Sequence, residues 1–385
     1  MTSVLYVHTR FDTPGGANTI AVETANRLSD RPDFEVAIAT ARFNDEYYSL
    51  NANVRLHEVG GGSPGSLAHW AKLPWVLRRI AVVIDEIDVD VVVFHSIPTP
   101  YWTLYLERVA PEVRFLWYAH DPNAYLNLPG KLRDVPFPLR SLMGVGLPAI
   151  RWVDRGVITT TLDGVIVNSE FTRGIIKDVY ELDAPVVYPG IDLDRFEQSD
   201  GERPSNRILF TVGQLNRYNN FDVLIRSMAE LAEQLDFPPH LIIAGTGPQR
   251  DSLEALARSE GLADLVEFTG YVTNDELIDY YRRSIATVYL PEDEPFGLVP
   301  IEAMATGTPV IALDSGGIRE TVVDGQTGML VANPLESSIA AALAKLVTSP
   351  DLCRKMGHKA RERSVSRFSI DNTVSGLEAI LGKYA

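Results

Sequence analysis

Cysteine is almost absent from this chain of 385 residues, in which Cys353 stands alone. A single cysteine excludes an internal disulfide and a zinc site built from several thiolates, and it suits a reducing compartment. Lysine is also scarce, with seven among 35 basic residues, and the net charge is −16. A negative, lysine-poor surface argues against general nucleic-acid binding.

Long hydrophobic runs are missing as well. A membrane-spanning helix needs about eighteen or more consecutive apolar residues, and the sequence has no such stretch. The apolar run Val4–Val7 is too short for the core of a signal peptide, and no basic segment precedes it. We therefore expect a cytoplasmic protein, at most peripheral at the cytoplasmic face of a membrane.

What the sequence does contain is an alternation of strand-like and helical segments. At 385 residues with 45% apolar content, two domains are expected. The apolar strand Val4–Val7 leads through a glycine turn into a helical pattern, and a second alternation begins at Ile208. This pattern predicts an α/β protein with two Rossmann-like, doubly wound domains. The expected parts are an N-terminal domain (1–193), a polar linker (194–206), a C-terminal domain (207–368) and a final helix (369–385).

Two carboxylates in the second half lie on either side of a helix start. Glu294 precedes Pro295, which cannot lie inside a helix, whereas Pro300 suits a first helical turn. The sequence thus predicts a helix from Ile301 to Thr306, with Glu302 in its first turn. The amides of residues 298–302 would then be unpaired and form an anion site. Carboxylates for hydroxyl groups and free amides for phosphate suit a nucleotide sugar.

Polar residues also end strands of the first half. His95 and His120 each follow an apolar strand, and Asp121-Pro122 bends the chain after the second. Ligands of open α/β sheets bind outside the carboxyl ends of the strands. Gly16 in the first turn would let a ligand approach the backbone. The alternative for each histidine is a residue that is only hydrogen-bonded at the end of its strand, and this alternative is favoured for His95 and disfavoured for His120.

Several of these segments together resemble the GT-B glycosyltransferases of the large retaining nucleotide-sugar family numbered four. The specific part is the sequence EPFGLVPIEAMATGTPVIA followed by GGIRETVVDGQTG. The less specific parts are Gly15-Gly16, His120, the segment 188–192, Gly245-Thr-Gly-Pro248 and Phe268-Thr-Gly-Tyr271. The resemblance covers nearly the whole chain.

The resemblance implies roles for the site residues. Glu302 would accept hydrogen bonds from the ribose hydroxyls, and Glu294 would hold a hydroxyl of the transferred sugar. The backbone of Phe296, Gly297, Leu298 and Val299 would line that sugar and the diphosphate. His120 would contact the sugar near the reacting carbon, and Gly16 would border the diphosphate or the acceptor. The remaining donor-binding candidates are Gly213, Arg217, Gly245, Gly247 and Tyr271.

The sequence departs from the family in one turn. The family carries an Arg and, five residues later, a Lys that clamp the diphosphate, and these positions here are Gln214 and Asn219. Fewer cations should weaken stabilisation of the departing phosphate. Arg217 lies in the same turn and is the expected substitute, with Arg250 as a weaker candidate.

The predicted function is retaining transfer of a hexosyl unit from a UDP- or GDP-linked sugar to the hydroxyl of a glycan or lipid-linked acceptor. We expect no cofactor and no obligatory metal, because Asp12, Asp121 and Asp192 are scattered. A catalytically weak or inert nucleotide-sugar-binding protein is the first alternative. A Rossmann oxidoreductase is disfavoured, because no G-x-G-x-x-G follows the first strand.

The segment from Lys131 to Arg155 mixes basic and apolar side chains in an otherwise acidic protein. Such a segment suits peripheral contact with an anionic membrane or with a lipid-linked acceptor. A partly solvated helix pair packed on the domain explains the same pattern equally well.

Overall fold

The computed structural model describes residues 1–61, 67–122, 124–127, 139–196 and 207–384. These residues form two compact units. The first contains residues 1–127 and 139–190 together with the C-terminal helix α14 (Ile370–Leu381), and the second contains the described part of 191–369. Apart from this C-terminal helix, the first unit therefore ends at Gly190, whereas the predicted boundary is residue 193. Most of the predicted linker, residues 197–206, lies outside the described residues.

The first unit is built on a parallel sheet of six strands in the order β3-β2-β1-β4-β5-β6. Its centre is buried on both faces, and for this reason its strands read as continuous apolar runs rather than as alternating ones. The strands are β1 (Thr2–His8), β2 (Phe34–Thr40), β3 (Arg55–Glu58), β4 (Val91–Phe94), β5 (Arg114–Ala119) and β6 (Gly164–Val167).

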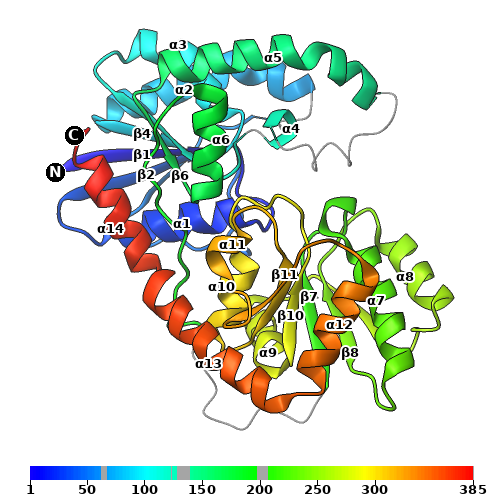
Figure 1. The fold of residues 1–385 in the computed structure, drawn as a ribbon. Coiled ribbons are helices and arrows are strands. Elements are labelled where there is room, and N and C mark those ends of the chain that lie inside the picture. The colour runs from blue at the N-terminus through cyan, green and yellow to red at the C-terminus, as the bar shows by residue number, and fades with distance from the viewer. Residues whose placement is uncertain (62–66, 123, 128–138, 197–206, 385) are drawn as a thin grey trace. The chain divides into compact units, whose positions relative to one another are not determined.

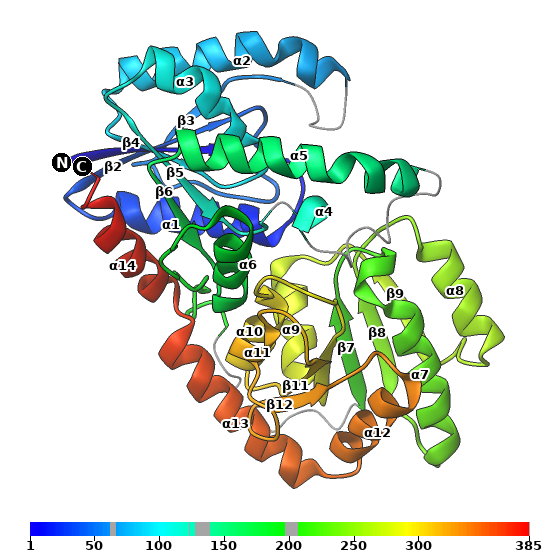
Figure 2. The ribbon, with the colours of Figure 1, turned by 45° about the horizontal axis from the view of Figure 1, so that its top comes forward.

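Helices cover both faces of this sheet (Figure 1). Leu5 and Val7 pack toward the face covered by α2 (Leu67–Glu86), α3 (Thr103–Val109), α5 (Leu139–Thr161) and α6 (Glu170–Tyr180). The opposite face is covered by α1 (Gly16–Ser29) and α14, which contact each other. Figure 2 shows α2, α3 and α5 side by side on their face. Short elements are η1 (Thr99–Trp102) and α4 (Ala124–Asn127).

The second unit repeats this plan. Its parallel sheet has the order β12-β11-β10-β7-β8-β9, which read backwards is the order of the first sheet, with β7 and β10 in the places of β1 and β4. The strands are β7 (Ile208–Val212), β8 (His240–Ala244), β9 (Val266–Gly270), β10 (Ala286–Tyr289), β11 (Val310–Leu313) and β12 (Gly328–Val331). In both sheets the winding direction reverses between the two central strands, which is where doubly wound domains bind ligands.

Helices also cover both faces of the second sheet. One core is formed with α7 (Phe221–Gln234), α8 (Arg250–Ser259) and α12 (Glu336–Val347). Helix α10 (Leu298–Ala305) contacts α9 (Asn274–Arg283), α11 (Ile318–Thr321) and α13 (Pro350–Arg367). A short helix, η3 (Arg217–Asn219), precedes α7. The predicted fold class, α/β with two doubly wound domains, is confirmed.

Candidate active site

The loop between β10 and α10 carries Glu294 and rests on the turn that follows β11. The amide of Gly317 donates a hydrogen bond to the carbonyl of Glu294 at 2.8 Å. A Cβ at Gly316 would lie 2.4 Å from that carbonyl oxygen, and one at Gly317 would lie 2.1 Å from the carbonyl oxygen of Pro295. Only glycine fits at these two positions, so the Gly-Gly pair allows the turn after β11 to pack directly against the backbone of the loop that carries Glu294.

Helix α10 begins earlier than the sequence predicts. It runs from Leu298 to Ala305, so Pro300 is its third residue and Glu302 lies in its second turn. The predicted start at Ile301 is wrong, and so is the prediction that all amides up to Glu302 are unpaired, because Ile301 and Glu302 lie beyond the residues whose amides lack intrahelical partners. The free donors at this end are the amides of Gly297, Leu298 and Val299, and Pro300 has none.

Gly297 makes this early start possible. Its φ of 84° is strained for any residue with a side chain, and a Cβ there would lie 2.7 Å from Cδ1 of Ile318. The tight entry therefore lets the chain turn directly from the loop into the helix. As a result, the amides at the helix start follow Glu294 by only a few residues.

Glu302 is partly buried and accepts a hydrogen bond from a tyrosine. The hydroxyl of Tyr281, a buried residue of α9, donates to Oε2 of Glu302 at 2.8 Å. Burial raises the pKa of Glu302, whereas the hydroxyl of Tyr281 and the charge of Arg195 lower it. A carboxylate accepts several hydrogen bonds, so Oε1 and the remaining lone pairs can take the hydroxyls of a ligand.

Glu294 is also partly buried, and its partner comes from the turn after β7. The hydroxyl of Tyr218 in η3 donates to Oε2 of Glu294 at 3.2 Å. Tyr289 ends β10 close by. Its pKa is well above the usual range because of burial and then of the charges of Glu294 and Glu302. Its hydroxyl therefore stays protonated near both carboxylates.

Neutral side chains stand in the turn after β7 at Gln214 and Asn219, the two positions for which the resemblance implies cations. Nδ2 of Asn219 donates to the carbonyl of Gln214 at 2.7 Å, and the amide of Asn219 donates to Oδ1 of Asn216 at 3.2 Å. Arg217 in the same turn is exposed and has no ion-pair partner among the described residues. Amide groups thus stabilise this turn, and Arg217 is the basic residue between Gln214 and Asn219.

The predicted glycines of this unit pack backbone against backbone. A Cβ at Gly245, whose φ is 122°, would lie 2.0 Å from the carbonyl oxygen of Gly213, and a Cβ at Gly247 would lie 2.4 Å from that of Leu215. The turns after β7 and β8 are therefore in direct contact, which gives these glycines a structural role. Tyr271, just past β9, is 53% exposed.

Arg250 is not available as a diphosphate clamp in this structure. Its Nε donates to Oε1 of Glu254 at 2.8 Å, and a terminal nitrogen donates to the carbonyl of Phe268 at 3.0 Å. These contacts direct the guanidinium toward its own helix and β9.

In the first unit, His120 belongs to a cluster of imidazoles at the carboxyl ends of three neighbouring strands. Nε2 of His120 lies 3.1 Å from Nδ1 of His95, and both rings are buried. His8 ends β1 nearby. Burial lowers the pKa of His120 to about 3 and of His8 to about 4, and it holds the pKa of His95 well below the usual value. The cluster is neutral at physiological pH.

Two further contacts shape this end of the first sheet. Nδ2 of Asn168, just after β6, donates to the carbonyl of His120 at 2.9 Å. Gly16 is the exposed first residue of α1, and the amide of Gly15 before it donates to the hydroxyl of Tyr48 at 3.0 Å. The start of α1 is thereby tied to the loop after β2.

The segment 131–155 lies partly outside the described residues, and its remainder belongs to α5. Two of its arginines are engaged with protein groups: Nε of Arg151 donates to the carbonyl of Leu126 at 2.9 Å, and Arg155 pairs with Glu181 at 2.8 Å. Trp152 is 77% exposed, and Ile150 and Val153 beside it are also exposed. The described part of this segment therefore presents apolar side chains more than free cations.

Metal-binding and membrane-spanning features were sought in the part of the chain that the structure describes. No group of three or more His, Cys, Asp or Glu side chains there is placed to hold a metal ion. Asp12, considered above, pairs with Arg10. Within the same residues, no helix combines the length and apolar character that crossing a bilayer requires.

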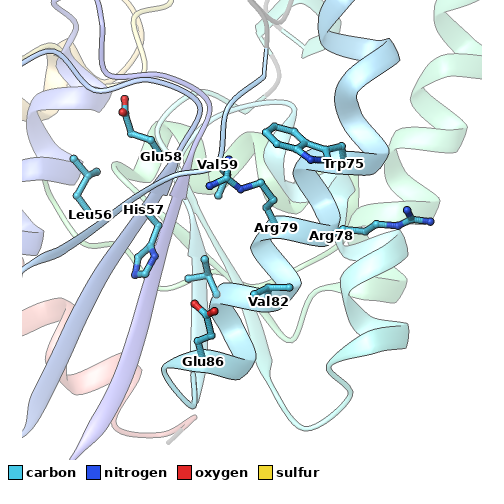
Figure 3. Close-up of a pocket in the computed structure, with 10 residues that line it drawn as sticks. Leu56, His57, Glu58, Val59, Trp75, Arg78, Arg79, Val82 and Glu86 are labelled. Atoms are coloured by element: carbon cyan, nitrogen blue, oxygen red, sulfur yellow. The ribbon is translucent and has the colours of Figure 1, made fainter.

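A cavity of about 470 Å³ lies elsewhere in the first unit, between β3 and α2. Figure 3 shows Trp75 and Arg79 on the helix side and His57 on the strand side, while Arg78 points away. Arg79 lies 4.9 Å from the centroid of the Trp75 ring. No predicted site residue lines this cavity.

Three tyrosines at the carboxylates were missed by the sequence reasoning. Tyr218 and Tyr281 donate to Glu294 and Glu302, and Tyr289 lies near both. Tyr218 stands next to Asn219, in the turn that the sequence singles out, so its position was a usable signal. Tyr281 reads as an ordinary apolar position of a helix, and nothing local connects it to Glu302.

Comparison with known proteins covers both units. The model of the family "Glycosyltransferase Family 4" matches residues 14–195, and that of "Glycosyl transferases group 1" matches residues 193–363. A D-inositol 3-phosphate glycosyltransferase of Rhodococcus erythropolis is 30% identical over 94% of this chain and 85% of that protein.

Two solved structures show the same fold. Sucrose-phosphate synthase of Thermosynechococcus elongatus has a TM-score of 0.83 and 20% identity, covering 100% of this chain and 99% of that one. HepE of Anabaena, solved in complex with UDP-glucose, has a TM-score of 0.79 and 17% identity, and the match covers both chains completely.

Proposed function

Since this chain belongs to glycosyltransferase family 4 and is a transferase of the GT-B fold, we propose that it moves a hexosyl unit from a nucleotide-diphosphate sugar to an acceptor hydroxyl with retained anomeric configuration. In this reaction the bond between the anomeric carbon and the β-phosphate oxygen breaks. A bond from the same carbon to the acceptor oxygen forms. The acceptor proton goes to the departing phosphate, and a nucleoside diphosphate leaves.

The observation that carries the proposal is the order of groups at the carboxyl end of β10. Glu294, the free amides of residues 297–299 and Glu302 follow one another along the loop and the first turns of α10. Carboxylates accept hydrogen bonds from hydroxyls, and amides at a helix start bind phosphate. In our proposal Glu302 holds the ribose, the amides hold the diphosphate and Glu294 holds the transferred sugar.

For the remaining donor-site candidates we propose contacts of the backbone or of a single side chain. Gly213 borders the diphosphate, and Arg217 supplies the charge that Gln214 and Asn219 lack. Tyr271 lies next to the base. Gly245 and Gly247 act indirectly, because their packing positions the turn after β7.

The proposed chemistry relies on positioning and on stabilisation of the departing charge. The proposal assigns no carboxylate as a nucleophile, and in it the departing phosphate oxygen serves as the base for the acceptor hydroxyl. Preorganised donors aimed at developing charge are among the largest catalytic effects in enzymes. We assign His120 and Gly16, which both lie in the first unit, to the acceptor side of the reaction.

A panel of UDP-, GDP- and ADP-sugars, scanned by thermal shift and then by transfer assays with and without EDTA, tests the proposal. The UDP-glucose complex of HepE makes uridine the first nucleotide to try. We expect one nucleotide to stabilise the protein and its sugar to be transferred, with EDTA having no effect. Absence of stabilisation by every nucleotide would refute the donor site, and an inverted product would refute retention.

A protein that binds nucleotide sugar without turnover is the second candidate, because neutral amides replace the two cations of the turn after β7. Calorimetry and an assay of donor hydrolysis separate the two. Binding without hydrolysis or transfer, over a broad set of acceptors, would favour the inert protein. Any turnover that depends on Glu294 would exclude it.

For the acceptor we propose a glycan or a lipid-linked hydroxyl compound, presented at a membrane surface. The exposed Ile150, Trp152 and Val153 on α5 support surface contact, since aromatic side chains favour the membrane interface. Sedimentation with vesicles of neutral and of anionic phospholipid tests this. Binding should weaken in Trp152→Ser. Equal recovery of wild type and variant in the supernatant would refute the contact and leave the donor reaction intact.

A further inference from the structure

The imidazole cluster of the first unit lies at the point where its sheet reverses direction. His8 is the last residue of β1 and His95 follows β4, and the register of these strands pairs Val7 with Phe94. His8 and His95 are thus the next pair of residues, and their side chains point to the same face. His120 follows β5, the neighbour of β4. The fold therefore gathers three imidazoles where doubly wound domains place their ligands.

Within the cluster, His95 and His120 form a direct pair. Nδ1 of His95 lies 3.1 Å from Nε2 of His120, and the two rings stack at 5.4 Å. His120 retains 8% of its exposure, whereas His95 retains 1%. Of this pair, His120 is the ring closer to the surface, and its nitrogen away from His95 is Nδ1.

Because each ring is neutral, every imidazole has one N–H donor and one acceptor nitrogen. The tautomer of His8 follows from its backbone contact. Its Nδ1 accepts a hydrogen bond from the amide of Arg10 at 3.2 Å, so its hydrogen is on Nε2. For His95 and His120 the contact allows two arrangements, in which either ring donates to the other.

The unpaired nitrogen of His95 decides between these arrangements. Its Nε2 is buried and has no hydrogen-bond partner among the described residues. A hydrogen there would make it an orphaned buried donor, which proteins tolerate less well than an orphaned acceptor. The cluster already holds one such donor, because Nε2 of His8 carries a hydrogen and has no hydrogen-bond partner among the described residues either. The hydrogen of His95 is therefore on Nδ1, which donates to Nε2 of His120.

We propose that His95 is a positioning residue that fixes the ring and the tautomer of His120, so that His120 offers an Nδ1–H donor to an oxygen of the substrate. This role rests on the proposed glycosyltransferase reaction. It makes His120 a neutral hydrogen-bond donor and excludes it as a base at Nδ1. The donated hydrogen bond would go to a hydroxyl of the transferred sugar or to an oxygen that gains charge as the donor bond breaks.

The first test measures the tautomers and needs no activity. The full-length protein, labelled with nitrogen-15 in its histidines, is studied by NMR, since protonated and unprotonated ring nitrogens differ widely in chemical shift. His120→Gln and His95→Asn assign the signals. We expect hydrogen on Nδ1 and none on Nε2 of His120, unchanged from pH 8 to pH 5.5. Hydrogen on Nε2 of His120 would overturn the proposal.

The second test uses a conservative and a disruptive substitution. In His95→Asn the side-chain amide can take the place of Nδ1 and still donate, whereas His95→Leu fills the site without a donor. We expect kcat of His95→Leu to fall by about tenfold or more, the order of one buried hydrogen bond, with His95→Asn recovering most of it. The donor KM and the nucleotide Kd should stay within about twofold in both.

His57→Leu is the matched control, because His57 is a partly buried histidine of β3 outside the cluster, and its kcat should not change. Equal losses in His95→Asn and His95→Leu would show a merely structural role and overturn the proposal. If His95→Leu does not fold, the NMR measurement of the histidine tautomers in the wild type still tests the proposal. If the wild type transfers no sugar at all, the proposed function fails, and the NMR result stands on its own.

Discussion

The two units of this protein have the same strand order, but different side chains stand at the ends of the two central strands of each sheet. In the first unit, the ends of β1 and β4 carry His8 and His95, neutral and buried. In the second unit, the corresponding ends of β7 and β10 lead to the turn of Asn219 and to Glu294. The same position in the strand order thus carries an uncharged imidazole cluster in one unit and, in the other, the carboxylates and helix-start amides that we propose as the donor site.

The difference shows how burial selects the charge state of such a site. The imidazoles are almost fully enclosed, and the cost of desolvating a cation keeps them neutral. Glu294 and Glu302 remain partly exposed and each accept a hydrogen bond from a tyrosine hydroxyl. Strand order therefore determines where a ligand is bound, and local burial determines which chemical groups can stand there.

Removing Glu302 should have the largest effect of all on nucleotide affinity. The effect should involve the second unit alone. If Glu302 binds the ribose as we propose, Glu302→Ala deletes two charge-assisted hydrogen bonds, and we expect a cost of roughly 3–5 kcal/mol, or more than about a hundredfold in nucleotide Kd measured by calorimetry. Glu302→Gln is the matched control for folding, because it still offers Tyr281 an acceptor. Nucleotide affinity unchanged in Glu302→Ala would contradict the site.

Glu294→Ala should separate transfer from nucleotide binding. The nucleotide Kd should stay within about threefold, while kcat should fall by roughly a hundred- to a thousandfold, or about 2.7–4 kcal/mol. Tyr218→Phe, which removes only the hydroxyl that contacts Glu294, should show a smaller loss of kcat. Full transfer activity in Glu294→Ala would disprove its assignment to the sugar.

The neutral cluster should make the first unit sensitive to acid. The pKa of His8 in the folded protein is about 4, below the ordinary value of 6.5, so the unfolded chain binds a proton first as the pH falls. The stabilisation is complete above pH 6.5 and is lost between there and pH 4, by an amount on the order of 3 kcal/mol. The other titratable groups of this cluster are Tyr6, Tyr118, His95 and His120.

Urea unfolding between pH 7.5 and pH 4.5 measures this loss. His8→Asn should show a shallower fall of the unfolding free energy with pH than the wild type. His358→Asn changes an exposed histidine of α13 and should leave the slope as it is. Identical slopes in His8→Asn and wild type would refute the buried, neutral state of His8.

Arg217→Ala should give the smallest of these effects. If Arg217 supplies the missing cation of the turn after β7, its loss costs about 2 kcal/mol of transition-state stabilisation, at the lower end for a charge donor because the side chain is exposed. Arg217→Lys should restore part of kcat/KM. A change of less than about twofold in Arg217→Ala would leave the helix-start amides as the diphosphate site.

Much of the second site could be read from the sequence because its signals are local. Pro295 and Pro300 confine the helix start to a few residues, and this places Glu294 in a loop and Glu302 in a helix. The error in the start of α10 has a physical reason. Because Gly297 adopts a positive φ, the helix begins at Leu298, two residues before Pro300. Helix propensities do not predict that backbone conformation.

Other features could not be read locally because they depend on contacts between distant segments. Tyr281 reaches Glu302 only after α9 and α10 pack together. The edge strands β3 and β12 were not predicted. The four residues of β3, Arg-Leu-His-Glu, carry little apolar pattern, whereas β12 is a short apolar run, Gly-Met-Leu-Val, that directly follows a turn. The glycines Gly316 and Gly317 read as a turn, and their support of the loop of Glu294 appears only in the folded unit.

The sequence by itself determined the α/β class, the two similar halves, the placing of Glu294 in a loop and of Glu302 in a helix, and the placing of His95 and His120 at strand ends. Proline, glycine and apolar runs act on their immediate neighbours, so these features need no tertiary contact. Tertiary structure alone decided that His8, His95 and His120 meet and stay neutral, and that tyrosines from other elements hold the carboxylates. Burial and hydrogen bonding arise only when strands far apart in sequence lie side by side in one sheet.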